Sequence, residues 1–215
     1  MFVKDQMSPH PIVITPDRSI YEAQRMMQEN NIRHLPVVTP KGQLIGLVTR
    51  TALDTALPSR LTTLSVWELN YQLNQIKVSE AMIRDVVTVS ELTPIEQAAR
   101  LMLEKKIGSL LVVRGDRLVG IITDIDLMRT MVELLGARQA GVRLTLKVPD
   151  QEGQLCKITS AIAEHNGYIA ALGTMPSDEA LKWWIMVKVR FADKDAIIAS
   201  LKETPEIEII DVRED

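Results

Sequence analysis

The chain has 215 residues, of which 46% are hydrophobic and 25% charged, and this composition argues against disorder and allows one large or two modest domains. The formal net charge is −3 and the Lys and Arg residues are scattered, which argues against a nucleic-acid partner. The N-terminal MFVKDQMSPH lacks the apolar core of a signal peptide, and no stretch approaches the roughly 18 apolar residues of a membrane span, so we expect a cytoplasmic protein with no membrane partner.

A repeat of about 50 residues occurs twice in the first part of the chain. Shifting the sequence by 75 residues places Met7 on Met82 and the pair at 37–38 on the pair at 112–113. After a one-residue deletion in the second copy, GLVTRTAL at 46–53 aligns with GIITDIDL at 120–127. The two octets differ in one respect that bears on function, because Asp126 of the second copy stands opposite Ala52 of the first.

Both copies predict the element order β-α-β-β-α. An extended segment leads into an amphipathic helix, a β-branched strand, a turn with Gly42 or Gly115, a second strand and a second helix. Pro94 suits the first turn of its helix. The expected ranges are 12–15, 19–30, 35–38 and 44–48 in the first copy, and 86–90, 94–105, 110–113 and 118–122 in the second.

The segment between the copies, residues 61–77, predicts a linker helix. Ser65 and Glu68 stand at capping-box spacing, and Trp67 and Tyr71 belong to an apolar pattern that we interpret as core packing.

After residue 136 the pattern changes, and residues 140–215 predict a second kind of domain. GVRLTLKV alternates like a half-buried strand, LCKITSAIAEHN has one apolar helical face, and two strands, a helix and a last strand follow. The predicted order is β-α-β-β-α-β, which is a ferredoxin-like arrangement. Trp183 and Trp184 are adjacent on a predicted strand, so they should face opposite sides of the sheet.

The repeats resemble a pair of CBS domains, the regulatory unit called a Bateman module. Met7, Met82, IRHLPVV at 32–38 and GIITDIDL at 120–127 carry this resemblance. The C-terminal segment VPDQEGQLCKITSAIAEHNGYI at 148–169 resembles an ACT domain, and the combination is similar to acetoin-utilisation AcuB-like proteins. The resemblance implies an α+β fold in which two β-α-β-β-α repeats pack as a pseudo-twofold pair beside a ferredoxin-like ACT domain. The expected domains are residues 1–60, the linker helix 61–77, residues 78–136 and the ACT domain 140–215.

Thr123 and Asp126 allow two interpretations. A Thr at a helix start with a carboxylate three residues later forms a relative of the capping box, worth about 1 kcal/mol of stability. The resemblance implies instead that Asp126 accepts hydrogen bonds from both hydroxyls of a ribose and that Thr123 adds a contact. Because Ala52 cannot hold a ribose, we expect the pocket built on Thr49 to bind a nucleotide weakly or not at all.

The resemblance also implies where the rest of an adenine nucleotide (AMP, ADP or ATP) would lie as a regulatory ligand. Adenine is expected against Val86, Val87 and the segment from Ile107 to Leu110, with Ser109 as a hydrogen-bond partner, and Gly120 would allow close approach of the backbone. Phosphates are expected at Arg33, His34 and Arg50 of the first copy, so that its phosphate clamp faces the ribose clamp of the second. The alternative is that these three are solvated or paired surface residues.

In the ACT-like segment, Asp150, Gly153, Leu155 and Asn166 are the candidate contacts for an effector, which in ACT domains is often an amino acid. The alternative is structural, with Asp150 and Gly153 starting a helix and Asn166 ending it. The resemblance also implies a homodimer formed through this domain. Because Trp183 and Trp184 should face opposite sides of their strand, one of them is a candidate subunit contact.

Nothing in the sequence indicates an enzyme. His10, His34 and His165 form no metal-ligand pattern with Cys156, and there is no P-loop or G-x-S-x-G motif. Cys156 is the single cysteine, and its lack of an internal disulfide partner fits a reducing compartment. We therefore expect no catalytic residue, no catalytic cofactor and no metal, but a non-catalytic regulatory protein that senses an adenine nucleotide and acts on another protein. The alternatives are a ligand-free scaffold that assembles an oligomer or holds a partner and, less favoured, an enzyme whose residues converge only in space.

Overall fold

The computed structural model describes residues 1–56, 73–191 and 193–214. The chain divides into two compact units, Met1–Leu127 and Met128–Asp215, each of which is described by itself. The division falls within a helix, α6 (Asp124–Leu134). Most of the predicted linker helix, including Ser65, Trp67, Glu68 and Tyr71, lies outside the described residues. The bounds of the four segments expected from the sequence stay predictions.

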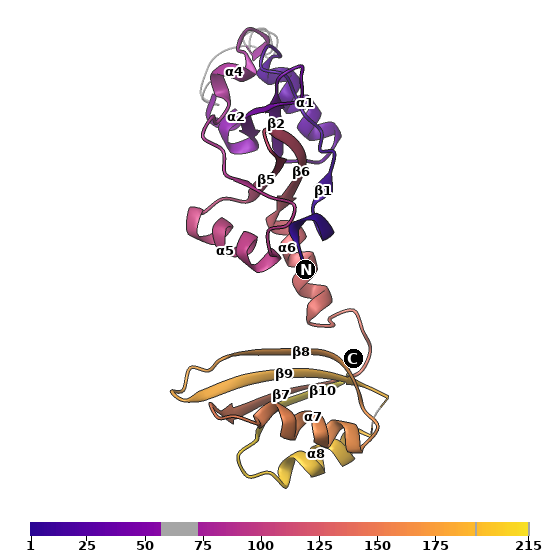
Figure 1. Ribbon diagram of the computed structural model, residues 1–215. Coiled ribbons are helices and arrows are strands. Elements are labelled where there is room, and N and C mark those ends of the chain that lie inside the picture. Colours follow the sequence, from indigo (N-terminus) through magenta and orange to yellow (C-terminus); the bar gives the residue numbers. More distant parts are fainter. Residues whose placement is uncertain (57–72, 192, 215) are drawn as a thin grey trace. The chain divides into compact units, whose positions relative to one another are not determined.

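The first unit contains both copies of the repeat, and the predicted helices and central strands are observed in each (Figure 1). The first copy contains η1 (Val3–Asp5), β1 (Ser8–Pro9), α1 (Ile20–Glu29), β2 (His34–Val38), β3 (Leu44–Thr49) and α2 (Arg50–Ala56). The second contains α4 (Val78–Ala81), β4 (Thr88–Val89), α5 (Ile95–Lys105), β5 (Ser109–Arg114), β6 (Arg117–Thr123) and α6.

The first helix of each copy shows why the repeat folds twice in the same way. In α1 the buried residues are Ile20, Ala23 and Met27, and in α5 they are the residues 75 positions later. This spacing puts the apolar side chains on one helical face, which packs on the sheet. The ends differ in detail, since Ser19 caps α1 through a hydrogen bond from the Glu22 N–H (3.2 Å), whereas Pro94 precedes α5 without such a bond.

Residues 7–15 lead into the first copy and residues 82–90 into the second, and we call them the leading segments. The first unit has two sheets, β1-β6-β5-β4 and β2-β3, and each leading segment crosses from one sheet to the other. It begins on the second hairpin strand of the other copy: Ser8 pairs with Ile121 through β1 and β6, and Ile83 forms the equivalent bridge to Leu47. It ends on its own copy, where β4 runs parallel to β5 and Ile14 bridges Val37 in the same sense. The two copies therefore exchange the first part of their leading segments.

The glycine of each octet is explained by this exchange. A Cβ atom at Gly46 would lie 2.7 Å from Sδ of Met82, and one at Gly120 would lie even closer to Sδ of Met7. The methionine that opens one copy therefore rests on the glycine of the other. We expected Gly120 to bring the backbone close to a ligand, but in the structure the side chain of Met7 occupies that space.

A small apolar cluster between the hairpins joins the two copies. Leu47 of the first copy and Leu111 and Ile121 of the second are buried together, with Val86 and others packed around them. Burying such a side chain stabilises the folded state by about 1.5–3 kcal/mol. Each copy also has its own core beneath its first helix.

The second unit has the predicted order β-α-β-β-α-β. After the end of α6 come β7 (Val142–Pro149), α7 (Gln154–Glu164), β8 (Tyr168–Pro176), β9 (Lys182–Arg190), α8 (Lys194–Lys202) and β10 (Glu208–Glu214). The strands form one antiparallel sheet in the order β10-β7-β9-β8, and α7 and α8 cover the same face of it (Figure 1).

The two faces of this sheet differ as the alternation along its strands predicts. Leu144, Leu146 and Val148 point into the core under the two helices, together with Trp183. On the other face the ammonium group of Lys147 lies 4.5 Å from the ring centre of Trp184 and 2.6 Å from Glu179. The adjacent tryptophans therefore do face opposite sides.

Candidate ligand-binding site

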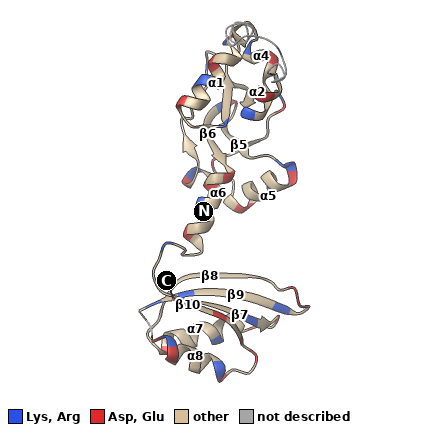
Figure 2. Ribbon diagram, turned by 180° about the vertical axis from the view of Figure 1, so that it is seen from behind, with Lys and Arg blue, Asp and Glu red and all other residues tan. Residues whose placement is uncertain are grey.

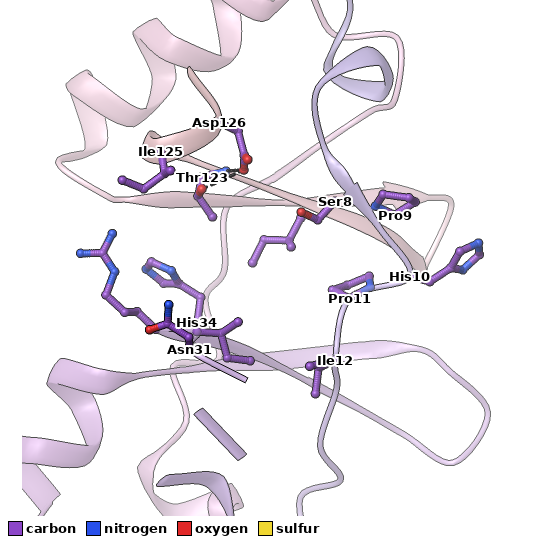
Figure 3. Close-up of a pocket in the computed structure, with 13 residues that line it drawn as sticks. Ser8, Pro9, His10, Pro11, Ile12, Asn31, His34, Thr123, Ile125 and Asp126 are labelled. Carbon is purple, nitrogen blue, oxygen red and sulfur yellow. Dashed lines mark hydrogen bonds between the residues drawn. The ribbon is translucent and has the colours of Figure 1, made fainter. Parts of the chain in front are cut away.

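The first unit contains a cavity of about 410 Å³ whose walls come from both copies of the repeat. One wall is formed by Ile121, Thr123, Ile125 and Asp126, at the junction of β6 and α6, and another by residues 31–34, before and at the start of β2. Residues 8–12 of the first leading segment form the side. Figure 3 shows Thr123 and Asp126 facing Asn31 and His34 across the cavity.

Asp126 both caps the helix and lines the cavity. Its Oδ2 accepts hydrogen bonds from the backbone N–H of Thr123 (2.9 Å) and from the Thr123 hydroxyl (2.8 Å), and the residue is only 7% exposed. The first bond is the half of a capping box in which the acid reaches back to the helix start. The capping hydrogen bond expected from the sequence is thus present. It holds the carboxylate of Asp126 at the wall of the cavity.

The equivalent threonine of the first copy, Thr49, makes a different hydrogen bond. The hydroxyl of Thr49 accepts a hydrogen bond from the N–H of Ala52 (3.1 Å), as an ordinary helix cap does. No carboxylate stands at position 52, so the hydroxyl takes over the capping role. In the second copy the equivalent hydroxyl, that of Thr123, donates a hydrogen bond to the carboxylate of Asp126.

Arg33 and His34 reach the same cavity, but Arg33 already has an acidic partner. Its Nη2 lies 3.4 Å from Oδ1 of Asp124, which also accepts a hydrogen bond from the N–H of Ile125 (2.9 Å). His34 is half-buried, and its pKa is lowered by burial and by Arg33, although Asp124 opposes this effect. At neutral pH the imidazole is therefore predominantly uncharged.

The structure separates the predicted site residues into two groups. Arg33, His34, Thr123 and Asp126 line this cavity together. The other predicted residues lie elsewhere: Val86 in the lining of a different cavity, of about 480 Å³, Val87, Ile107 and Leu110 in or against the core of the second copy, Ser109 buried, Gly120 under Met7, and Arg50 with an exposed side chain.

The exchange of the leading segments explains this separation. The shift of 75 residues maps Val86 and Val87 onto Pro11 and Ile12, which do line the cavity beside Asp126. It likewise maps Ile107 onto Ile32, another lining residue. The residues expected from the sequence belong to the copy that holds Asp126, whereas in the structure their counterparts from the other copy line the cavity. The repeat alignment therefore gives residues 8–12 and 31–34 as the equivalents of the expected residues, but it does not tell which copy supplies the cavity.

A second cavity, of about 390 Å³, lies in the second unit at the start of α7, and Asp150, Gly153 and Leu155 line it. Gly153 has a left-handed φ of +84° and no side chain caps the helix. The Gln154 side chain is 4% exposed, and its Nε2 donates to Glu206 (3.1 Å), while its buried Oε1 has no hydrogen-bond partner. Asn166 lies beyond the other end of the 11-residue helix and does not line this cavity.

Among the described residues, no three His, Cys, Asp or Glu side chains are grouped so that they could hold a metal ion. His10 and His34 line the first cavity, whereas His165 follows the end of α7. Within the described ranges no helix is both long and apolar enough to span a bilayer. Figure 2 shows basic and acidic residues interspersed along the ribbon of both units.

Comparison with known proteins identifies the repeat. The model of the CBS domain family matches residues 3–59 and 78–133. A solved structure of a putative acetoin utilization protein, AcuB, from Vibrio cholerae is 30% identical, covers 65% of this chain and 96% of its own, and has a TM-score of 0.54.

Two similar structures were solved with adenosine compounds. The CBS domain pair of protein MJ0100, in complex with 5′-methylthioadenosine and S-adenosyl-L-methionine, is 30% identical over 65% of this chain and 98% of its own, with a TM-score of 0.52. CBSX2 in complex with AMP is 29% identical over 61% of this chain and 96% of its own, with a TM-score of 0.51.

Some curated relatives are much longer than the region they share with this chain. The match spans 46% of an uncharacterized protein, MJ1225, and 22% of an L-aspartate semialdehyde sulfurtransferase, both from Methanocaldococcus jannaschii. The identities are 31% and 33%, over 59% of this chain in each case.

Proposed function

Because this chain belongs to the CBS domain family, we propose that it is a non-catalytic regulatory protein that binds an adenine nucleotide or a related adenosine compound in the cavity beside Asp126. The observation that carries this proposal is the placement of a largely buried carboxylate and a hydroxyl on the wall of a cavity between two CBS domains. Its volume is within the range of about 300–1,000 Å³ that is usual for small-molecule sites. The adenosine compounds bound by the two similar structures support the ligand class.

The lining offers each part of an adenosine a suitable partner. The carboxylate of Asp126 would accept hydrogen bonds from the ribose diol, and the hydrogen bond from the Thr123 hydroxyl would hold that carboxylate in place. The purine ring would lie among apolar side chains of both copies, including Ile12, Ile32 and Ile125. Ile12 and Ile125 are 38% and 53% exposed, so a bound ring would remove apolar surface from water.

Binding of a panel of adenosine compounds to Asp126→Ala and to Thr49→Ala tests this site. We expect Asp126→Ala to weaken binding about 10-fold or more, since a hydrogen bond to a charged group contributes about 1.5–3 kcal/mol. Thr49→Ala should bind like the unmodified chain, because Thr49 does not line the cavity. Circular dichroism of both variants controls for folding.

Three results would contradict the proposal in different ways. Equal losses in both variants would show that the site is not built around Asp126. An unchanged melting temperature across the whole panel would favour the ligand-free scaffold, because a ligand that binds only the native state must stabilise it. Turnover of ATP or AMP during incubation would favour an enzyme.

We further propose that ligand binding is communicated through α6. This helix begins at the cavity with Asp124 and Asp126. Beyond its end, Leu135 lies close to Gly173 on β8 of the second unit. Coupling of this kind typically amounts to about 1–3 kcal/mol, or roughly a 5- to 150-fold change in affinity. A partner protein that binds the second unit would then respond to the ligand.

For the second unit we propose an ACT domain that forms a homodimer and binds an amino acid at the start of α7. The strand order β10-β7-β9-β8, with both helices on one face, supports a ferredoxin-like fold. The cavity supports the ligand class, because an uncapped helix start attracts a carboxylate and the buried Oε1 of Gln154 lacks a donor that an ammonium group could supply.

Thermal shift with the common amino acids, on the full chain and on Gln154→Leu, tests this second site. We expect stabilisation by at least one amino acid and its loss in the variant. Binding that survives in Gln154→Leu, or no stabilisation by any amino acid, would contradict it. Light scattering coupled to size exclusion measures the oligomer.

A further inference from the structure

The start of α6 offers a ligand few hydrogen-bond donors. Helix starts bind phosphate through backbone N–H groups that lack an acceptor. Here the N–H of Thr123 donates to Asp126, that of Asp124 donates to the carbonyl of Gly108 (3.1 Å), and that of Ile125 donates to Asp124. Three consecutive donors are thus satisfied within the protein, and two of their acceptors are carboxylates.

The charges around the cavity are also unfavourable for several phosphates. Among the described residues that line it, Arg33 is the one with a permanent positive charge. Against it stand two carboxylates, Asp126 in the lining and Asp124 in the ion pair with Arg33. Burial keeps His34 largely uncharged at neutral pH, and the exposed side chain of Arg50 is not part of the lining.

Asp124 is held in this position by its surroundings. Its Oδ1 is fixed by the N–H of Ile125 and by Arg33. Its Oδ2 and the ring of His34 both face Gly108, since a Cβ atom built on this glycine would lie 3.5 Å from the Oδ2 and 3.7 Å from the ring. The carboxylate is therefore placed between the helix start and the opposite wall.

We infer that the cavity selects an adenosine derivative whose 5′ substituent is neutral or positively charged, such as a thioether or a sulfonium, over a nucleoside di- or triphosphate, and that Asp124 determines this selection. The inference rests on the proposed function, because it assumes that Asp126 holds the ribose diol. The 5′ carbon is bonded to C4′, the neighbour of the C3′ that carries one hydroxyl of this diol, so with the diol on Asp126 its substituent would lie near the first turn of α6 and the carboxylate of Asp124.

The preference should be moderate. Arg33 and Asp124 are 57% and 50% exposed, and such a pair contributes only about 0–1 kcal/mol, so a phosphate could draw Arg33 away. The carboxylate of Asp124 would then stand unpaired beside the phosphate. In a partly solvated site we expect the resulting discrimination to be about 5- to 10-fold.

The test is calorimetric titration of the full chain at neutral pH with 5′-methylthioadenosine, S-adenosylmethionine, AMP and ATP. Asp124→Asn is the informative variant, since its amide oxygen can still accept the hydrogen bond from Ile125 while the charge is lost. Asp116→Asn is the matched control, because it removes the same charge from a residue that lines a different cavity and is not the partner of Arg33. Circular dichroism confirms that both variants fold.

We expect the thioether and the sulfonium to bind the unmodified chain about 5-fold or more tightly than ATP, and Asp124→Asn to reduce or invert this ratio while the control leaves it unchanged. The inference is overturned if ATP binds as tightly as the thioether, or if both variants shift the ratio equally. In those cases the proposed function still stands, provided that binding requires Asp126. If none of the four compounds binds, both the inference and the proposed function fail.

Discussion

Replacing Gly120 by alanine should destabilise the first unit through a contact that only the exchanged arrangement creates. The new methyl group would overlap Sδ of Met7 and lie 3.2 Å from its Cγ and Cε. Overpacking a well-packed site costs about 1–3 kcal/mol of the free energy of unfolding. Since the atoms in the way belong to a flexible, partly exposed methionine, we expect a value near the lower end, about 1–2 kcal/mol.

A double-mutant cycle isolates this contact. Met7→Ala removes the obstructing side chain and has a packing cost of its own, but it makes room for the methyl group at position 120. The double variant should therefore be less destabilised than the sum of the two single variants, by about 1 kcal/mol. Urea unfolding followed by circular dichroism measures all three. Gly108→Ala serves as the control, because a Cβ there meets nothing closer than 3.5 Å.

Additivity in this cycle would refute the reasoning. If the single effects sum to within about 0.3–0.5 kcal/mol, the side chain of Met7 does not lie on Gly120. The leading segment of the first copy would then not cross to the second, and residues 8–12 would not belong to the cavity of Asp126. The candidate ligand contacts would then again be those expected from the sequence in the second copy, Val86, Val87 and residues 107–110.

Three further predictions concern single positions. Thr49→Ala should lower the free energy of unfolding by about 1 kcal/mol, measured with urea, because the N–H of Ala52 loses its cap. The hydrogen bond from Lys147 lowers the pKa of Glu179 from 4.5 to about 2. The ionised carboxylate therefore stabilises the second unit at pH values above 4.5, and this stabilisation is lost as the pH falls towards 2. In Glu179→Gln the melting temperature should fall less steeply over that pH range. Gly153→Ala should destabilise by about 1 kcal/mol in thermal unfolding, since alanine is strained at a φ of +84° even where space is open.

Much of the local structure follows from local pattern. The 75-residue shift predicts two copies of the same unit, and the buried residues of α1 and α5 match position by position because both copies place apolar side chains on one helical face. The alternation in β7 and β9 likewise predicts that Trp183 and Trp184 face opposite sides. These features depend on neighbours within a few residues, which the sequence displays directly.

The amino-acid sequence by itself determined the repeat, the order of its helices and strands, and the contrast between Asp126 and Ala52. Only the tertiary structure decided which copy completes the cavity and which charges meet there. Two equivalent hairpins offer equivalent edges, so no local pattern specifies which of them a leading segment will pair with; the pairing of Ser8 with Ile121 and of Arg33 with Asp124 joins residues about a hundred positions apart. The ligand site is made of such long-range pairs, and for that reason its composition could not be deduced from the motif that marks it.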